Sequence, residues 1–242
     1  MMRSIDLIPT REDIIKSYNL IVGGIDEQAS SDDQERAYGG VIRAAKGKML
    51  ESMTKHLVRI AWNELGQDDF RLSIGNEKTY RIPIRDEYIQ NLKSKEVRDY
   101  IYQNQERYFY RAQVDVHVFV DYKFVLGIEC KAYAENAMLK RILVDFMLLK
   151  HMHKNLSCCL IQLESQLGGD YSQPLSSKTL GSTSSHTLMS FFETVDLEIV
   201  TLLEGERRVD KPIHKPEHFK VLDDRLVEAT VLRLKGLLEI YI

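Results

Sequence analysis

The stretch from Val114 to Ala132 constrains the fold of this 242-residue chain more than any other. Apolar residues alternate with other residues from Val114 to Val120, a polar turn covers Asp121–Lys123, and a second apolar stretch runs from Phe124 to Ala132. Successive side chains of a strand point to opposite faces, and a short polar turn joins antiparallel strands. The stretch therefore predicts two paired strands.

The surrounding sequence predicts helices on both sides of this pair. Together the elements predict an α/β fold, with a mixed β-sheet flanked by helices. The expected elements are a short helix near Arg11–Tyr18 followed by a loop or mobile arm, a helix from Val41 to about Gly66, a hairpin or two short strands within 70–84, helical structure within 86–110, a helix over Glu135–Lys150, a strand over Leu156–Leu163, a loop over 166–187, a strand over Leu197–Leu203 and a helix over Leu226–Leu238.

Two carboxylates and one ammonium fall on the paired strands. Glu129 and Lys131 are two residues apart and therefore share a face, whereas Cys130 points to the opposite, packed face. The short turn brings Asp115 of the first strand to the same end of the pair. We therefore expect Asp115, Glu129 and Lys131 to lie together.

This trio has the chemistry of a site for phosphodiester hydrolysis. Carboxylates among apolar neighbours are costly unless a cation compensates them, and Mg²⁺ prefers oxygen ligands. Asp115, Glu129 and the backbone carbonyl of Cys130 are the predicted metal ligands. The cation would polarise the phosphodiester, and Lys131 would orient the attacking water or stabilise the developing charge.

The spacing of Asp115 from Glu129-Cys130-Lys131 resembles the motif of the PD-(D/E)xK nuclease superfamily. Val114 stands where the motif usually has proline, and the resemblance covers about residues 45–165. Many members carry a glutamate on the helix before the hairpin, which implies that Glu51 is an auxiliary acid of the metal site.

Within this superfamily the chain is most similar to type II restriction endonucleases. The resemblance implies a magnesium-dependent enzyme that cuts double-stranded DNA at a specific sequence, acts as a homodimer and has a cognate DNA methyltransferase in the same system. It also implies one endonuclease domain over 1–242, with a catalytic core at about 45–165 and an N-terminal arm at about 1–36. The C-terminal part, about 190–242, would serve dimerisation or DNA recognition.

Other interpretations of the same residues stay open. Asp…Glu-x-Lys also arises by chance in sheets, Glu51 also fits a solvated helix face, and His117 fits either a substrate contact or a packed strand residue. The Tyr-rich stretch over 100–111 fits nucleic-acid binding or packing. The alternative functions are a repair or recombination nuclease of the same superfamily and a DNA-binding protein without catalysis.

Charge and cysteine content limit the partners and the compartment. The net charge is −3, so a nucleic-acid partner needs a local basic surface. The three cysteines lie in apolar stretches and show no Cys-x-x-Cys spacing. No apolar run approaches the roughly 20 residues that span a bilayer, and the polar first residues do not resemble a signal peptide. We therefore expect a cytoplasmic protein without a membrane partner.

Overall fold

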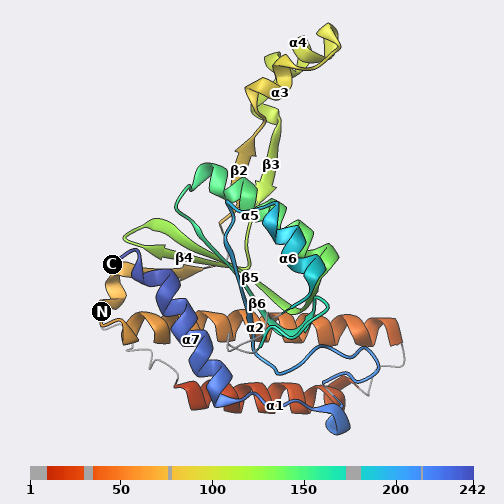
Figure 1. The fold of residues 1–242 in the computed structure, drawn as a ribbon, viewed down its shortest axis with the longest axis vertical. Coiled ribbons are helices and arrows are strands. Elements are labelled where there is room, and N and C mark those ends of the chain that lie inside the picture. Colours follow the sequence, from red (N-terminus) through yellow and green to blue (C-terminus); the bar gives the residue numbers. More distant parts are fainter. Residues whose placement is uncertain (1–9, 30–34, 76–77, 173–180, 214) are drawn as a thin grey trace.

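A five-stranded mixed sheet lies between two layers of helices in the computed structural model (Figure 1). The structure describes residues 10–29, 35–75, 78–172, 181–213 and 215–242. In spatial order the strands are β1 (Leu72–Gly75), β4 (Val116–Val120), β5 (Lys123–Glu135), β6 (Ser157–Gln166) and β7 (Leu197–Thr201). In this order the first three strands are antiparallel neighbours and the last three are parallel neighbours, which confirms the predicted mixed α/β fold.

Each face of the sheet has its own helical cover. One face packs against α2 (Glu35–Glu64), with α1 (Arg11–Ala29) and α7 (Asp224–Glu239) beside it, and the other packs against α5 (Asn136–Met152) and α6 (Thr183–Ser190). Short 3₁₀ helices lie in the segments that connect the longer elements. They are η1 (Asp69–Arg71), η2 (Gln105–Arg107) and η3 (Pro216–His218).

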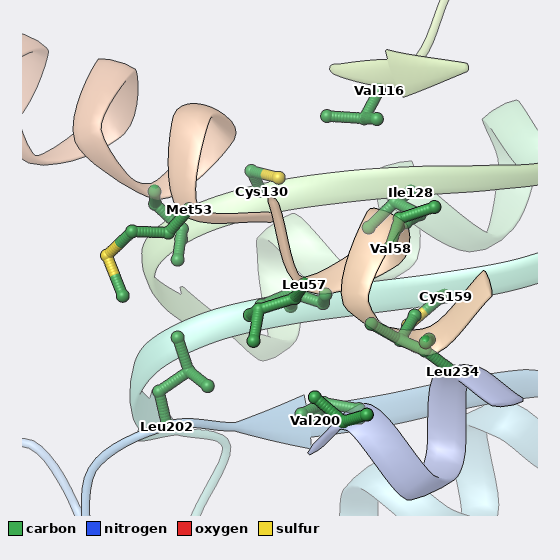
Figure 2. Packing of buried hydrophobic residues seen from close by; sticks show 14 of the residues in the cluster. Met53, Leu57, Val58, Val116, Ile128, Cys130, Cys159, Val200, Leu202 and Leu234 are labelled. Atoms are coloured by element: carbon green, nitrogen blue, oxygen red, sulfur yellow. The ribbon is translucent and has the colours of Figure 1, made fainter. Parts of the chain in front are cut away.

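The α2 side of β5 forms the centre of the first core. Ile128 and Cys130 of β5 lie beside Met53 and Leu57 of α2, and Leu234 of α7 closes the cluster (Figure 2). All five side chains are buried. Full burial of one such aliphatic side chain contributes about 1.5–3 kcal/mol, so this packing fixes β5 firmly against α2.

The opposite side of β5 packs closely against α5. Gly127 has no side chain, and a Cβ atom placed there would lie 3.0 Å from the ring of Phe146. This distance is tighter than ordinary van der Waals contact, so a larger residue would require the Phe146 ring to shift by a few tenths of an ångström. The glycine lets α5 approach β5 next to Glu129.

A two-stranded ribbon projects from this body (Figure 1). Its strands are β2 (Tyr80–Pro83) and β3 (Phe109–Ala112), and α3 (Asp86–Gln90) and α4 (Lys95–Gln103) lie beyond them at its tip. The expectation of two short strands within 70–84 is confirmed, but they do not form a hairpin. Strand β1 pairs with β4, and β2 pairs with β3.

The short helix expected near Arg11–Tyr18 is confirmed, but the loop or mobile arm expected after it is wrong for residues 19–29, because the helix α1 continues to Ala29. Its residues Ile14, Tyr18 and Val22 recur at four-residue intervals and are buried against the core. The remainder of the predicted arm at 1–9 and 30–34 lies outside the described residues.

Strand β3 overlaps the end of the stretch 86–110 that was expected to be helical, and a helix occupies part of the loop expected over 166–187. The remaining predicted elements agree with the structure, with shifts in their bounds. The helix expected from Val41 begins at Glu35, and β5 continues to Glu135. Helix α6 begins within the stretch expected to be a loop, of which 173–180 lies outside the described residues. None of the helices in the described ranges is long and apolar enough to cross a membrane.

Candidate active site

The pairing of β4 with β5 brings the three predicted residues together. Val116 pairs with Ile128, so Asp115, one residue before β4, reaches the level of Glu129 on β5. The ammonium Nζ of Lys131 lies 2.7 Å from Oδ2 of Asp115 and 2.5 Å from Oε2 of Glu129. The structure therefore places one ammonium between two carboxylates.

The backbone of Cys130 holds Asp115 in place. Its N–H donates a hydrogen bond of 2.7 Å to Oδ2 of Asp115, the oxygen that also contacts Lys131. The thiol points to the other face, where Sγ lies 3.4 Å from Oγ1 of Thr54 on α2. Cys130 therefore reaches the site through its backbone, and its side chain belongs to the core.

The pKa values of Glu129 and Lys131 are both raised, which favours the neutral form of the carboxyl group and the charged form of the amine. Burial raises the pKa of Glu129 to about 7. The negative charge of Asp115 adds to this increase, and the Lys131 ammonium only partly opposes it. Burial by itself lowers the pKa of Lys131, but the two carboxylates outweigh this effect and raise it. One ammonium thus leaves a buried carboxylate incompletely compensated, a situation that a bound cation relieves.

A cavity of about 330 Å³ opens in front of the trio. Tyr110 of the ribbon donates a hydrogen bond of 2.9 Å from its hydroxyl to Oδ1 of Asp145 on α5, and Arg141 lies 3.6 Å from the same carboxylate. The cavity is lined by Gln113, Val114, Asp115, Glu129, Lys131, Met138, Arg141, Ile142 and Asp145.

Arg141 and Asp145 were not among the predicted site residues. Their four-residue spacing is the one local signal, since it places them as an ion pair on one helix face. Their position at the cavity depends on the packing of α5 against the sheet and the ribbon, which no local pattern contains.

The donor set fits a hard divalent cation that keeps part of its water shell. Across the described part of the chain, no group of three His, Cys, Asp or Glu side chains is arranged to hold a metal ion. Asp115 and Glu129 therefore offer two carboxylates, and the remaining ligands would be backbone oxygen and water. Mg²⁺ binds in this way, through one or two carboxylates and several waters.

Glu51 is the predicted site residue that the structure does not bring to the trio. It is half-buried on α2, it does not line the cavity, and no contact that the structure describes joins it to Asp115, Glu129 or Lys131. Its role in the metal site stays a prediction.

His117 and the Tyr-rich stretch have different surroundings. His117 is fully buried between the rings of Phe124 and Tyr80, at centroid distances of 4.9 and 5.9 Å, which agrees with a packed strand residue. Tyr100 and Tyr102 are exposed on α4 and are not core residues. Helix α4 belongs to the projecting arm, which consists of the ribbon and the helices at its tip (residues 80–112).

Comparisons with known proteins give one close relative. The type II restriction enzyme DdeI of Desulfomicrobium norvegicum is 51% identical to this chain over 221 residues, which cover 90% of this chain and 91% of the relative. No family model matches the chain. A solved structure described as the native BbvCI A2B2 tetramer has a TM-score of 0.37 and 10% sequence identity, covering 96% of this chain and 89% of that chain. A likeness this weak supports no conclusion about this chain.

Proposed function

The chain belongs to the family of type II restriction enzymes, and we propose that it cuts double-stranded DNA at the site formed by Asp115, Glu129 and Lys131. It is a site-specific endonuclease and therefore a hydrolase. The assignment of the three residues rests on their convergence at one cavity.

Asp115 and Glu129 would hold a magnesium ion, together with the backbone carbonyl of Cys130. A bound Mg²⁺ polarises the phosphodiester and balances the charge that develops on it. The Cys130 N–H keeps the Asp115 carboxylate turned toward the cavity. Gly127, two residues before Glu129 on β5, allows the close approach of Phe146 beside the site.

Lys131 supplies a positive charge from the chain at the reacting phosphate. Its raised pKa keeps the ammonium protonated at neutral pH. From its position between the carboxylates it can orient the attacking water and stabilise charge on the phosphate oxygens. The attacking water loses a proton to solvent as its oxygen bonds to the phosphorus, one P–O bond breaks, and the leaving oxygen takes a proton from solvent water.

The observation that carries this proposal is the double contact of Lys131 with Asp115 and Glu129 at the cavity. The test uses purified protein, phage DNA and magnesium. We expect discrete fragments from the wild-type protein and at least a hundredfold slower cleavage, as an order of magnitude, from Lys131→Ala and Asp115→Ala. DNA binding by both variants should be largely retained.

Asp121→Asn is the matched control, since Asp121 is a carboxylate of the same strand pair. It lies in the exposed turn, where it pairs with Arg71 at 2.7 Å. This variant should cleave at the wild-type rate. Wild-type rates in Lys131→Ala or Asp115→Ala would refute the site assignment.

The assembly and the system around the enzyme are further parts of this proposal. A palindromic DNA site matches two active sites related by a two-fold axis, so we expect a homodimer. Sedimentation equilibrium of the purified protein tests this expectation.

A cognate DNA methyltransferase should be encoded nearby, because host DNA needs protection from a site-specific nuclease. No observation favours a repair nuclease or a DNA-binding protein without catalysis.

A further inference from the structure

Two arginines face each other on the outer side of the ribbon. Arg81 of β2 is the direct cross-strand neighbour of Arg111 of β3, and both side chains are exposed. Their guanidinium carbons lie 3.7 and 5.7 Å from the centre of the Phe109 ring. Both guanidinium groups therefore lie next to the Phe109 ring.

These two charges have no acidic partner among the ion pairs that the structure describes. Arg81 donates to the backbone carbonyl of Glu106 at 3.2 Å, whereas the neighbouring arginines Arg85 and Arg107 pair with the carboxylates of Glu87 and Glu106. Like charges on directly opposite residues destabilise a strand pair. An external anion would relieve this repulsion.

The local charge of the arm has the sign that a polyanion needs. Residues 80–112 contain seven Lys and Arg against five Asp and Glu, whereas the whole chain has a net charge of −3. A basic surface on an acidic chain is the electrostatic signature of a local contact with nucleic acid.

The arginine pair also has a fixed position relative to the catalytic trio. Arg111, Gln113 and Asp115 follow one another at two-residue intervals, and Gln113 already lines the cavity. Four residues of extended chain span at most about 13 Å, and a DNA strand rises about 3.4 Å per nucleotide. The Tyr110–Asp145 hydrogen bond ties this part of the ribbon to α5.

We propose that Arg81 and Arg111 bind the sugar-phosphate backbone of duplex DNA, within about four nucleotides of the scissile phosphate. This inference rests on the proposed function, since it takes DNA as the substrate. Guanidinium groups bind phosphate oxygens bidentately, and Phe109 holds their planes in place. Such contacts position the duplex and do not read its sequence.

The test compares the salt dependence of binding. The affinity of wild-type protein and of Arg81→Ala/Arg111→Ala for duplex DNA is measured by fluorescence anisotropy without magnesium, at several salt concentrations. Each lost phosphate contact lowers the slope of log affinity against log salt by about 0.9. We expect the double variant to lose nearly two units of slope and to bind roughly tenfold more weakly per arginine.

Arg107→Ala is the matched control. It removes a positive charge of the same arm that Glu106 already pairs with, so the slope should stay near the wild-type value. Arg81→Lys/Arg111→Lys keeps both charges and should retain most of the slope. Thermal unfolding of each variant verifies that the fold is retained.

A second measurement locates the contact. Single phosphates near the mapped cut are replaced with uncharged methylphosphonates. The wild-type protein should lose affinity at one or two positions within about four nucleotides, where the double alanine variant loses nothing further. A wild-type protein that cuts DNA while the double variant keeps its slope would overturn this inference alone. A wild-type protein that neither binds nor cuts DNA would overturn the proposed function as well.

Discussion

At the scale of single residues, His117 shows how the core around strands β4 and β5 controls ionisation. Burial lowers the pKa of His117 to about 4, the positive charge of Lys78 adds to this effect, and the Gly75 backbone opposes it. The imidazole is therefore neutral in the folded protein at neutral pH. In the unfolded chain its pKa returns to about 6.5.

This difference predicts a loss of stability in mild acid. The folded pKa lies below the unfolded one, so the unfolded state binds more protons between the two values, and stability falls as the pH drops from about 6.5 towards 4. Between pH 7 and pH 5 the contribution of His117 to the free energy of unfolding should decrease by about 2 kcal/mol. Urea denaturation of wild type and His117→Phe at both pH values measures this, since phenylalanine does not titrate. Equal decreases in both proteins would contradict it.

Residue spacing made the trio predictable, but not the remainder of the cavity. Glu129 and Lys131 are two residues apart on one strand, and a short turn brings back Asp115, so local periodicity was sufficient. The contact of Tyr110 with Asp145 joins residues 35 positions apart. It depends on where the ribbon leaves the sheet, which no local pattern encodes.

At the scale of elements, α1 is an integral part of the first core. Tyr18 is fully buried, and its hydroxyl donates a hydrogen bond of 2.8 Å to the backbone carbonyl of Lys220. The helix thus joins the start of the described chain to the segment that precedes α7.

Substitutions on α1 should therefore reduce the free energy of unfolding. We expect Tyr18→Ala to cost about 3–5 kcal/mol and Tyr18→Phe to cost about 1 kcal/mol, the value of one hydrogen bond. Leu20→Ala on the same helix is the control, since Leu20 is 79% exposed and should change stability by less than about 0.5 kcal/mol. Chemical denaturation measures all three, and an unchanged stability of Tyr18→Ala would show that α1 does not pack on the body.

Two of the differences between the expected and the observed elements have clear physical causes. The polar residues after Val22 suggested a loop, although the four-residue interval of Ile14, Tyr18 and Val22 contained the helical signal. Gly75 suggested a turn between β1 and β2, yet β1 pairs with β4. Alternation shows that a segment is a strand but not which strand it pairs with, because pairing is decided by the packing of the whole sheet.

At the scale of the whole molecule, the three cysteines report on the integrity of both cores. Cys130, Cys158 and Cys159 are free and buried. Burial raises the pKa of Cys158 to about 12 and raises the pKa values of the other two thiols as well. The thiolate is the reactive form, so none of the three should react readily in the folded protein.

Alkylation with iodoacetamide, followed by mass spectrometry, tests this prediction. The native protein should remain unmodified at neutral pH, and the protein in concentrated urea should gain three modifications. Rapid modification of a thiol in native buffer would show that its core opens without global unfolding.

One face of strand β5 packs into the first core, and the other presents Glu129 and Lys131 to the cavity, with consequences for molecules that fold incorrectly. If β5 shifted by one residue against its neighbours, Glu129 and Lys131 would enter the apolar core and Cys130 would enter the cavity. Burying this ion pair in the apolar core, away from Asp115 and water, would cost several kcal/mol and would strongly disfavour folding. A misaligned chain therefore unfolds and does not persist as a folded but inactive competitor for DNA. Packing of the core thus selects the register of β5 that places Glu129 and Lys131 at the proposed site. The active fraction of a preparation should thus equal its folded fraction.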